Sequence, residues 1–193
     1  MTKQLALGSI LGSIVLFIWG ALSWMVIPWP GDPLRAFTNP EAMEQAIKAN
    51  VPVSGNYLMP NEVKRSPGMT DEQYKKANDD AMAKMTQGPM IFASVRLEPM
   101  GSMGRYMGIA FLTTLIVVFL ASFLLAQTTG LSYKNRVLFI TLIGIIIFIG
   151  GHGDEWNWWG FSGAYMMMQM AEIVIGWLLA SFVVAKFVRG KTA

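Results

Sequence analysis

Four long apolar stretches, at 5–27, 106–127, 137–149 and 165–188, restrict what this chain can fold into. A helix that crosses a hydrocarbon core of about 30 Å needs about 20 mostly apolar residues, so three of the stretches are long enough by themselves. The third gives only about 20 Å of helix, so we expect it to continue toward Trp156, to tilt less than its neighbours or to thin the bilayer. With 53% hydrophobic and 14% charged residues, the chain has the composition of an integral membrane protein.

These stretches predict a mainly α integral membrane protein: a four-transmembrane-helix bundle with a small extracytoplasmic α+β cap between helices 1 and 2. The predicted segments are a helix over 1–27, a periplasmic cap over 28–105, a helix over 106–127, a cytoplasmic loop over 128–136, a short helix over 137–151, a periplasmic Trp-rich loop over 152–163, a helix over 164–188 and a cytoplasmic tail over 189–193.

The distribution of charge predicts which ends are cytoplasmic. Both termini and the 128–136 loop carry basic residues and no acidic ones, as the positive-inside rule requires of short cytoplasmic segments. The net charge of +3 therefore reflects membrane topology and contact with anionic lipid, and we expect no nucleic-acid partner. We expect a multi-pass membrane protein with both termini in the cytoplasm. The basic residues concerned are Lys3, Lys134, Arg136, Lys186, Arg189 and Lys191.

The segment 28–105 has the amino-acid composition of a small soluble domain. Asn39 before Pro40 is typical of a helix start, and Thr70 with Gln73 forms a capping box at a second one. Strands are predicted over 51–59 and 90–97, pairing with each other. Because a segment this small buries little core by itself, we expect it to lean on the helices, on another protein or on a second copy of the chain.

Glu172 is the only acidic residue inside a predicted span, and an ionisable group in hydrocarbon needs a partner, a cavity or a proton. One hypothesis is that it anchors a lipid, quinone or other amphiphile within a Met- and Trp-rich outer cavity. The alternative is a neutral or hydrogen-bonded residue that holds helices together. The candidate ligand-binding residues are Glu172, Gln169, Thr113, Thr114, Trp158 and Met168.

Two further groups of residues suggest metal chemistry. His152, Asp154 and Glu155 lie close together in the sequence and can in principle bind a divalent cation or perform acid–base chemistry, although they match no established zinc spacing. A polar turn with an aromatic belt explains them equally. Met-rich runs on the outer side suit Cu(I), whereas methionine more often fills irregular packing.

Small residues at helical spacing predict close helix packing, within the chain or between copies. They are Gly8 and Gly12 in the first span, Gly104 and Gly108 at the start of the second, and Gly176 in the last.

Several functions are disfavoured by what the sequence lacks. Without cysteine it has no disulfide, Fe–S cluster or Cys-ligated zinc, and it carries no phosphate-binding, dinucleotide, GxSxG or HExxH motif. We therefore expect no cofactor, and a non-enzymatic accessory or interaction subunit, working through its cap and Trp-rich rim, is favoured over an enzyme.

Three segments carry a resemblance: WGALSW at 19–24, GPMIFAS at 88–94 and WNWWGFS at 156–162. In these the chain resembles a group of small four-span bacterial inner-membrane proteins. The resemblance implies the compartment and the number of spans, and it carries no activity or functional residue.

Overall fold

The computed structural model describes residues 2–61 and 63–191 and divides into two compact units. One consists of Met1–Arg35 with Gly101–Ala193, and the other of Ala36–Met100. We call them the membrane unit and the cap and describe each by itself.

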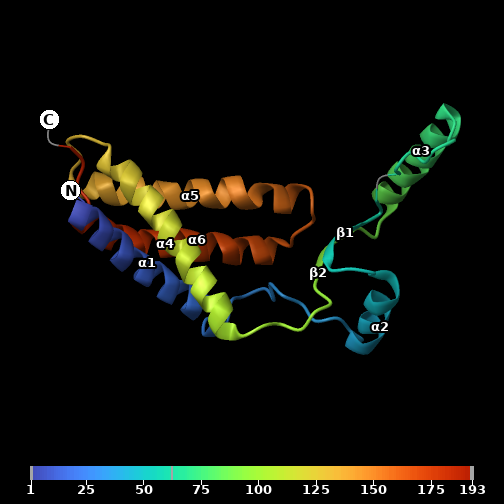
Figure 1. Cartoon of the computed structure of the whole chain (residues 1–193), viewed down its shortest axis with the longest axis horizontal. Helices are drawn as coiled ribbons and strands as arrows, with labels where there is room; N and C mark the ends of the chain where they lie inside the picture. Colours follow the sequence, from blue (N-terminus) through green and yellow to red (C-terminus); the bar gives the residue numbers. More distant parts are fainter. Residues whose placement is uncertain (1, 62, 192–193) are drawn as a thin grey trace. The chain divides into compact units, whose positions relative to one another are not determined.

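The membrane unit contains four helices, all long and apolar enough to cross a membrane (Figure 1). They are α1 (Thr2–Met25), α4 (Met103–Ala126), α5 (Tyr133–Asn157) and α6 (Gly163–Phe187). This confirms the prediction of a mainly helical chain with four membrane-length helices.

Helix α6 is central, because it packs against both α5 and α1. Helix α4 packs along α1 and contacts α5 more sparsely. Val118, Leu125, Ile140 and Val184 are fully buried where these helices meet, and Trp177 is 4% exposed.

Glycines set the helix spacing at several of these contacts. A Cβ at Gly12 would lie 2.6 Å from Val184 Cγ2, and one at Gly8 would lie 2.7 Å from Val188 Cγ2, so α1 and α6 approach too closely for a larger residue. Gly144, which the sequence analysis did not single out, receives Trp177 in the same way between α5 and α6. Nothing lies within 4 Å of a Cβ at Gly104 or Gly108, so neither is at a contact between helices of this chain, and packing between copies at these two positions stays a prediction.

The structure shows that the third apolar stretch belongs to a longer helix that continues past Trp156, which was one of the three alternatives for this short stretch. Helix α5 begins at Tyr133, where the Ser132 side chain accepts from the Asn135 N–H, and it runs on to Asn157 instead of ending at 151. Each glycine near 150 costs a helix only about 1 kcal/mol, whereas uncoiled backbone in hydrocarbon leaves polar groups without partners at several kcal/mol each. The 25-residue helix is about 37 Å long and needs no thinned bilayer.

One end of the membrane unit is held together by bonds to backbone carbonyls. Arg136 donates from Nε to the Ala185 carbonyl at 3.0 Å, and the Tyr133 hydroxyl donates to that of Phe182 at 3.0 Å. The Lys191 N–H donates to the Thr128 carbonyl at 2.7 Å. Both chain ends and the α4–α5 loop therefore lie at the same end of the unit, together with the basic residues of the termini and of that loop (Figure 1).

The cap contains α2 (Pro40–Asn50), β1 (Gly55–Met59), α3 (Asp71–Gln87) and β2 (Ile91–Val95). The strands pair antiparallel, with Tyr57 opposite Ala93, which confirms the predicted element order and pairing. Both predicted caps form: Asn39 Oδ1 accepts from the Ala42 N–H at 2.9 Å, and Thr70 and Gln73 make the reciprocal capping box.

The cap has almost no buried core. Among the described residues of 36–100, Ala81 is the one buried hydrophobic side chain, at 9% exposure. Phe37, Val53 and Met100 are each at least 60% exposed. Its elements are therefore held by local hydrogen bonds rather than by packing.

Candidate functional site

A groove of about 640 Å³ opens between α1, α4 and α6 in the membrane unit. Helix α1 forms its floor, since α1 packs against both other helices, while α4 and α6 share no extensive contact within the described residues. We call it the lateral groove. It is lined by Leu16, Phe17, Trp19, Gly20, Ala21, Trp24 and Met25 of α1, Met103, Met107, Ala110 and Thr114 of α4, and Glu172, Ile173 and Trp177 of α6.

Glu172 lies on the wall of the lateral groove and is half-buried. The Trp24 side chain forms a hydrogen bond with its carboxyl group. A Cβ at Gly20 would lie 3.7 Å from Glu172 Oε1, so the carboxyl faces α1 at a residue that leaves space beside it. On α1 the carboxyl group thus has one polar neighbour, the Trp24 side chain, while His152 of α5 and Tyr165 of α6 are titratable neighbours.

Trp19 fixes the backbone at the same point. Its Nε1 donates to the Glu172 carbonyl at 2.8 Å, which joins α1 to α6 across 153 residues of sequence. Gly176 makes this possible, because a Cβ there would lie 2.7 Å from Trp19 Cδ1. The indole ring of Trp19 thus occupies the space that Gly176 leaves by having no side chain.

Glu172 is the only charged residue among those that line the lateral groove. The Thr114 hydroxyl, which also lines it, donates to the Ala110 carbonyl of its own helix at 2.8 Å. His152 of α5 lies near Glu172 and does not line the groove. The groove is therefore an apolar, aromatic channel with a single acidic anchor.

The predicted ligand-binding residues divide into two groups. Glu172 and Thr114 line the lateral groove, whereas Gln169, Thr113, Trp158 and Met168 do not. Thr113 and Thr114 both donate to the Ala110 carbonyl instead of bonding to Glu172.

The other residues of that prediction lie elsewhere. Met168 is buried, Trp158 is 65% exposed, and Gln169 Oε1 is buried without a hydrogen-bond partner among the described residues.

Several lining residues were missed by sequence reasoning. On α4 a signal was present, because Met103, Met107, Ala110 and Thr114 follow one another at spacings of four, three and four, which is one face of a helix. On α1, Gly20 and Trp24 are likewise one turn apart. Nothing local indicated that these two faces meet around Glu172.

The predicted metal triad is not assembled. His152 Nδ1 lies 2.6 Å from Glu155 Oε2, and the imidazole stacks on Phe148 with ring centroids 5.8 Å apart. Asp154 is two residues from His152 on the same helix and so lies on another face. In the part of the chain that the structure describes, no group of three His, Asp or Glu side chains is placed to hold a metal ion.

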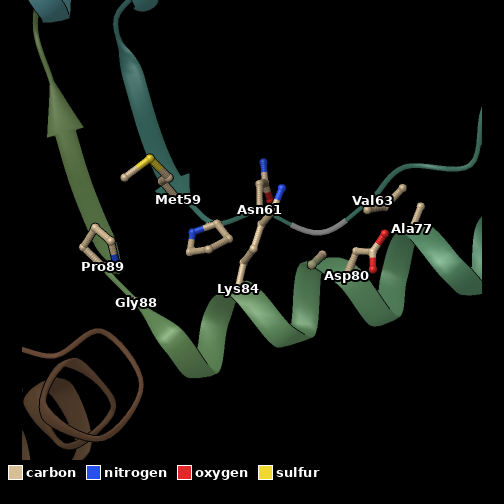
Figure 2. A pocket seen from close by; sticks show the side chains of 10 residues that line it. Met59, Asn61, Val63, Ala77, Asp80, Lys84, Gly88 and Pro89 are labelled. Carbon is tan, nitrogen blue, oxygen red and sulfur yellow. The ribbon is translucent and has the colours of Figure 1, made fainter.

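Two other hollows are less suited to a ligand. One of about 330 Å³ between α1 and α4 is lined by Ala6, Ser9, Ile10, Leu115, Ile116, Phe119 and Leu120 and offers no charged group. The other, of about 480 Å³, belongs to the cap. Figure 2 shows it between α3 and the chain that leaves β1, with Asp80 and Lys84 at its edge. It adjoins residue 62, which lies outside the described residues.

No protein-family model, curated protein or solved structure matches this chain. The resemblance to small four-span inner-membrane proteins therefore stays a prediction.

Proposed function

We propose that this protein binds an amphiphilic small molecule in the lateral groove, with Glu172 as its polar anchor. The observation that carries the proposal is the combination of a groove of about 640 Å³ with one half-buried carboxyl group as its only charge. Ligand sites commonly have volumes of about 300–1,000 Å³ and mostly apolar walls with few polar groups. The groove meets both criteria.

In the proposed membrane orientation, the lateral groove faces the hydrocarbon region of the bilayer. We infer that the four helices cross a bacterial inner membrane with both termini in the cytoplasm, since the basic residues gather at the end of the membrane unit where the chain ends lie. Glu172 then lies about 14 Å along α6 from Gly163, within the hydrocarbon region. An ionisable group at that depth is costly, by at least about 2.5 kcal/mol, which favours a functional role for it.

In this proposal the ligand enters sideways from the lipid, between α4 and α6. Its apolar part packs against Phe17, Met103 and Met107, and its head group meets Glu172 and Trp24. No bond is made or broken, so the absence of a recognisable catalytic motif in the sequence is no obstacle.

The test is the amphiphile content of the protein purified from its native membrane. Native mass spectrometry of the wild type should show a bound amphiphile at a defined stoichiometry, and Glu172→Ala should lose it. Asp154→Asn is the matched control, because Asp154 is an exposed acidic residue outside the groove. The same bound species in the wild type and in Glu172→Ala would refute the proposal.

A second candidate function is that of an accessory subunit that docks through its cap. It is favoured by one observation: Ala81 is the one buried hydrophobic side chain in the described part of 36–100. Large apolar side chains such as Phe37 and Val53 are then available to a partner protein or a second copy of the chain.

Hydrogen exchange tests this second candidate. Amides of the cap should exchange more slowly in native membranes than in the detergent-solubilised monomer if a partner covers them. Equal exchange in the two conditions would exclude it.

A further inference from the structure

The charge of the lateral groove limits which head groups it can accept. Its lining contains one acidic residue, Glu172, and no Lys, Arg or His among the described residues. An anionic head group, such as a fatty-acid carboxylate or a phosphate, would meet a like charge in surroundings of low dielectric constant, where repulsion is strong. An ionised Glu172 therefore disfavours anionic amphiphiles.

The aromatic walls of the lateral groove favour cationic head groups over neutral ones. Phe17, Trp19, Trp24 and Trp177 give the groove four aromatic side chains. The faces of aromatic rings attract cations, and tryptophan does so most strongly. Because Trp19 Nε1 is engaged by the Glu172 carbonyl and the Trp24 side chain by the Glu172 carboxyl, both indoles are held beside the charge.

The bonding of Glu172 leaves part of its charge uncompensated. In the described structure its side chain has the Trp24 hydrogen bond, His152 and Tyr165 lie farther away, and the hydroxyl of Thr114 is turned to its own helix. A neutral head group can add one hydrogen bond. A cation adds a hydrogen bond or close contact and also neutralises the carboxylate, which is why buried charges in proteins are paired.

Resting on the proposed function, we infer that the ligand of the lateral groove is a lipophilic cation. Its ammonium or similar head group would lie between Glu172 and the indoles of Trp19 and Trp24, and its apolar part along Phe17, Met103 and Met107. This assigns a chemical class to the site: amphiphilic amines and quaternary ammonium compounds, in preference to neutral or acidic lipids.

A matched pair of probes separates charge from hydrophobicity. We would use ω-bromoundecyl-trimethylammonium and ω-bromoundecanol, which share an apolar chain and differ in the charge of the head group. Bromine quenches indole fluorescence within its reach. Because three of the seven tryptophans line the lateral groove, the saturable part of the quenching reports its occupancy, and quenching of the others by probe in the detergent rises without saturation. The full-length protein is kept in an uncharged maltoside detergent so that the detergent does not compete for the carboxylate.

The inference predicts that both probes quench saturably in the wild type and that the ammonium compound binds more tightly. Glu172→Gln should weaken ammonium binding by about tenfold, which is about 1.4 kcal/mol, and should change the affinity for the alcohol by less than about twofold. Glu172→Asp, which keeps the charge, should fall between wild type and Glu172→Gln. Asp154→Asn should behave as wild type.

The outcomes distinguish this inference from the function on which it rests. If the alcohol binds and Glu172→Gln leaves ammonium binding unchanged, the inference is wrong and the amphiphile site stands. If neither probe quenches saturably in the wild type, the proposed function fails together with the inference. Because the alcohol must still bind to Glu172→Gln, loss of ammonium binding cannot be attributed to misfolding.

Discussion

The membrane unit and the cap are stabilised in opposite ways. In the membrane unit, side chains such as Val118, Leu125 and Ile140 have no exposed surface, and glycines bring helices close enough for aromatic rings to pack on their backbones. In the cap, both helices begin at well-formed caps and the strands are fully paired, yet Ala81 is the one buried hydrophobic side chain among its described residues. Local hydrogen bonding can thus define elements that tertiary packing barely supports.

This contrast has a consequence for function. A closely packed unit can hold one carboxyl group and three indoles in fixed positions, which is what a selective site requires. A unit with little core can change its contacts at low cost and suits docking to a partner. The lateral groove and the cap are therefore assigned different roles, and the predictions below test the difference in packing on which those roles depend.

The largest effect is expected at the α5–α6 contact. A Cβ at Gly144 would lie 2.4 Å from Trp177 Cβ, so Gly144→Leu cannot be accommodated without separating the helices. We expect a loss of about 3 kcal/mol in the free energy of unfolding, at the upper end of the usual cost of overpacking. Thermal unfolding in detergent measures it.

Gly108→Leu is the matched control for this change, because nothing lies within 4 Å of a Cβ at Gly108. It should unfold at the wild-type temperature or slightly above. Equal losses at the two positions would mean that the close contacts of the membrane unit do not stabilise it.

The next effect concerns the cap, where a local bond should matter more than packing. Thr70 is the N-cap of α3 and accepts from the Gln73 N–H at 3.2 Å. Thr70→Ala should cost about 1 kcal/mol, seen as faster hydrogen exchange throughout α3. Thr86→Ala, near the end of the same helix, removes only a bond to the Ala83 carbonyl and should leave exchange at the start of α3 unchanged.

A comparable or smaller loss is expected at the junction of α1 and α6. Trp19→Phe keeps an aromatic ring against Gly176 and removes the hydrogen bond to the Glu172 carbonyl. We expect a loss of about 1 kcal/mol in the free energy of unfolding. We also expect weaker ligand binding, because Glu172 is no longer held in place. Trp156→Phe, at a position 63% exposed, should change neither quantity.

The fold could be predicted from the sequence wherever the signal is local. Apolar length predicts the four helices, and Asn39 and the Thr70–Gln73 pair predict where α2 and α3 begin, because a cap is made by residues within one turn. The continuation of α5 toward Trp156 was one of three alternatives in the sequence, because the apolar length of 137–149 does not by itself decide how a short span completes its crossing. Apolar length and N-cap residues are enough to predict that a helix exists. Where a helix ends inside a membrane also depends on the cost of leaving backbone groups without hydrogen bonds in hydrocarbon.

The candidate site was only partly predictable, for a related reason. Glu172 was found because a charge within an apolar span is rare in any sequence. Its partners Trp19, Gly20 and Trp24 are about 150 residues away, and no local pattern indicates which faces of α1 and α6 meet. The same limit explains why Gly8 and Gly12 lie at a helix contact whereas Gly104 and Gly108, with the same spacing, do not.

The smallest effect is a pH dependence of the cap. The Ser54 hydroxyl donates to Glu98 Oε2 at 2.5 Å and accepts from the Leu97 N–H at 2.8 Å, so it joins the residue before β1 to the chain after β2. The hydrogen bond from Ser54 holds the pKa of Glu98 below its usual value.

A lowered pKa in the folded state means that the carboxylate stabilises the fold above its usual pKa. This contribution is lost as the pH falls through the lowered pKa of Glu98. The protection of amides at β1 and β2, which is the intrinsic exchange rate at each pH divided by the observed rate, should therefore fall modestly on acidification below about 4.5. Ser54→Ala should abolish that part of the pH dependence. If the wild type and Ser54→Ala show the same pH profile, the bond does not hold the ends of the two strands together, and strand pairing alone supports this side of the cap.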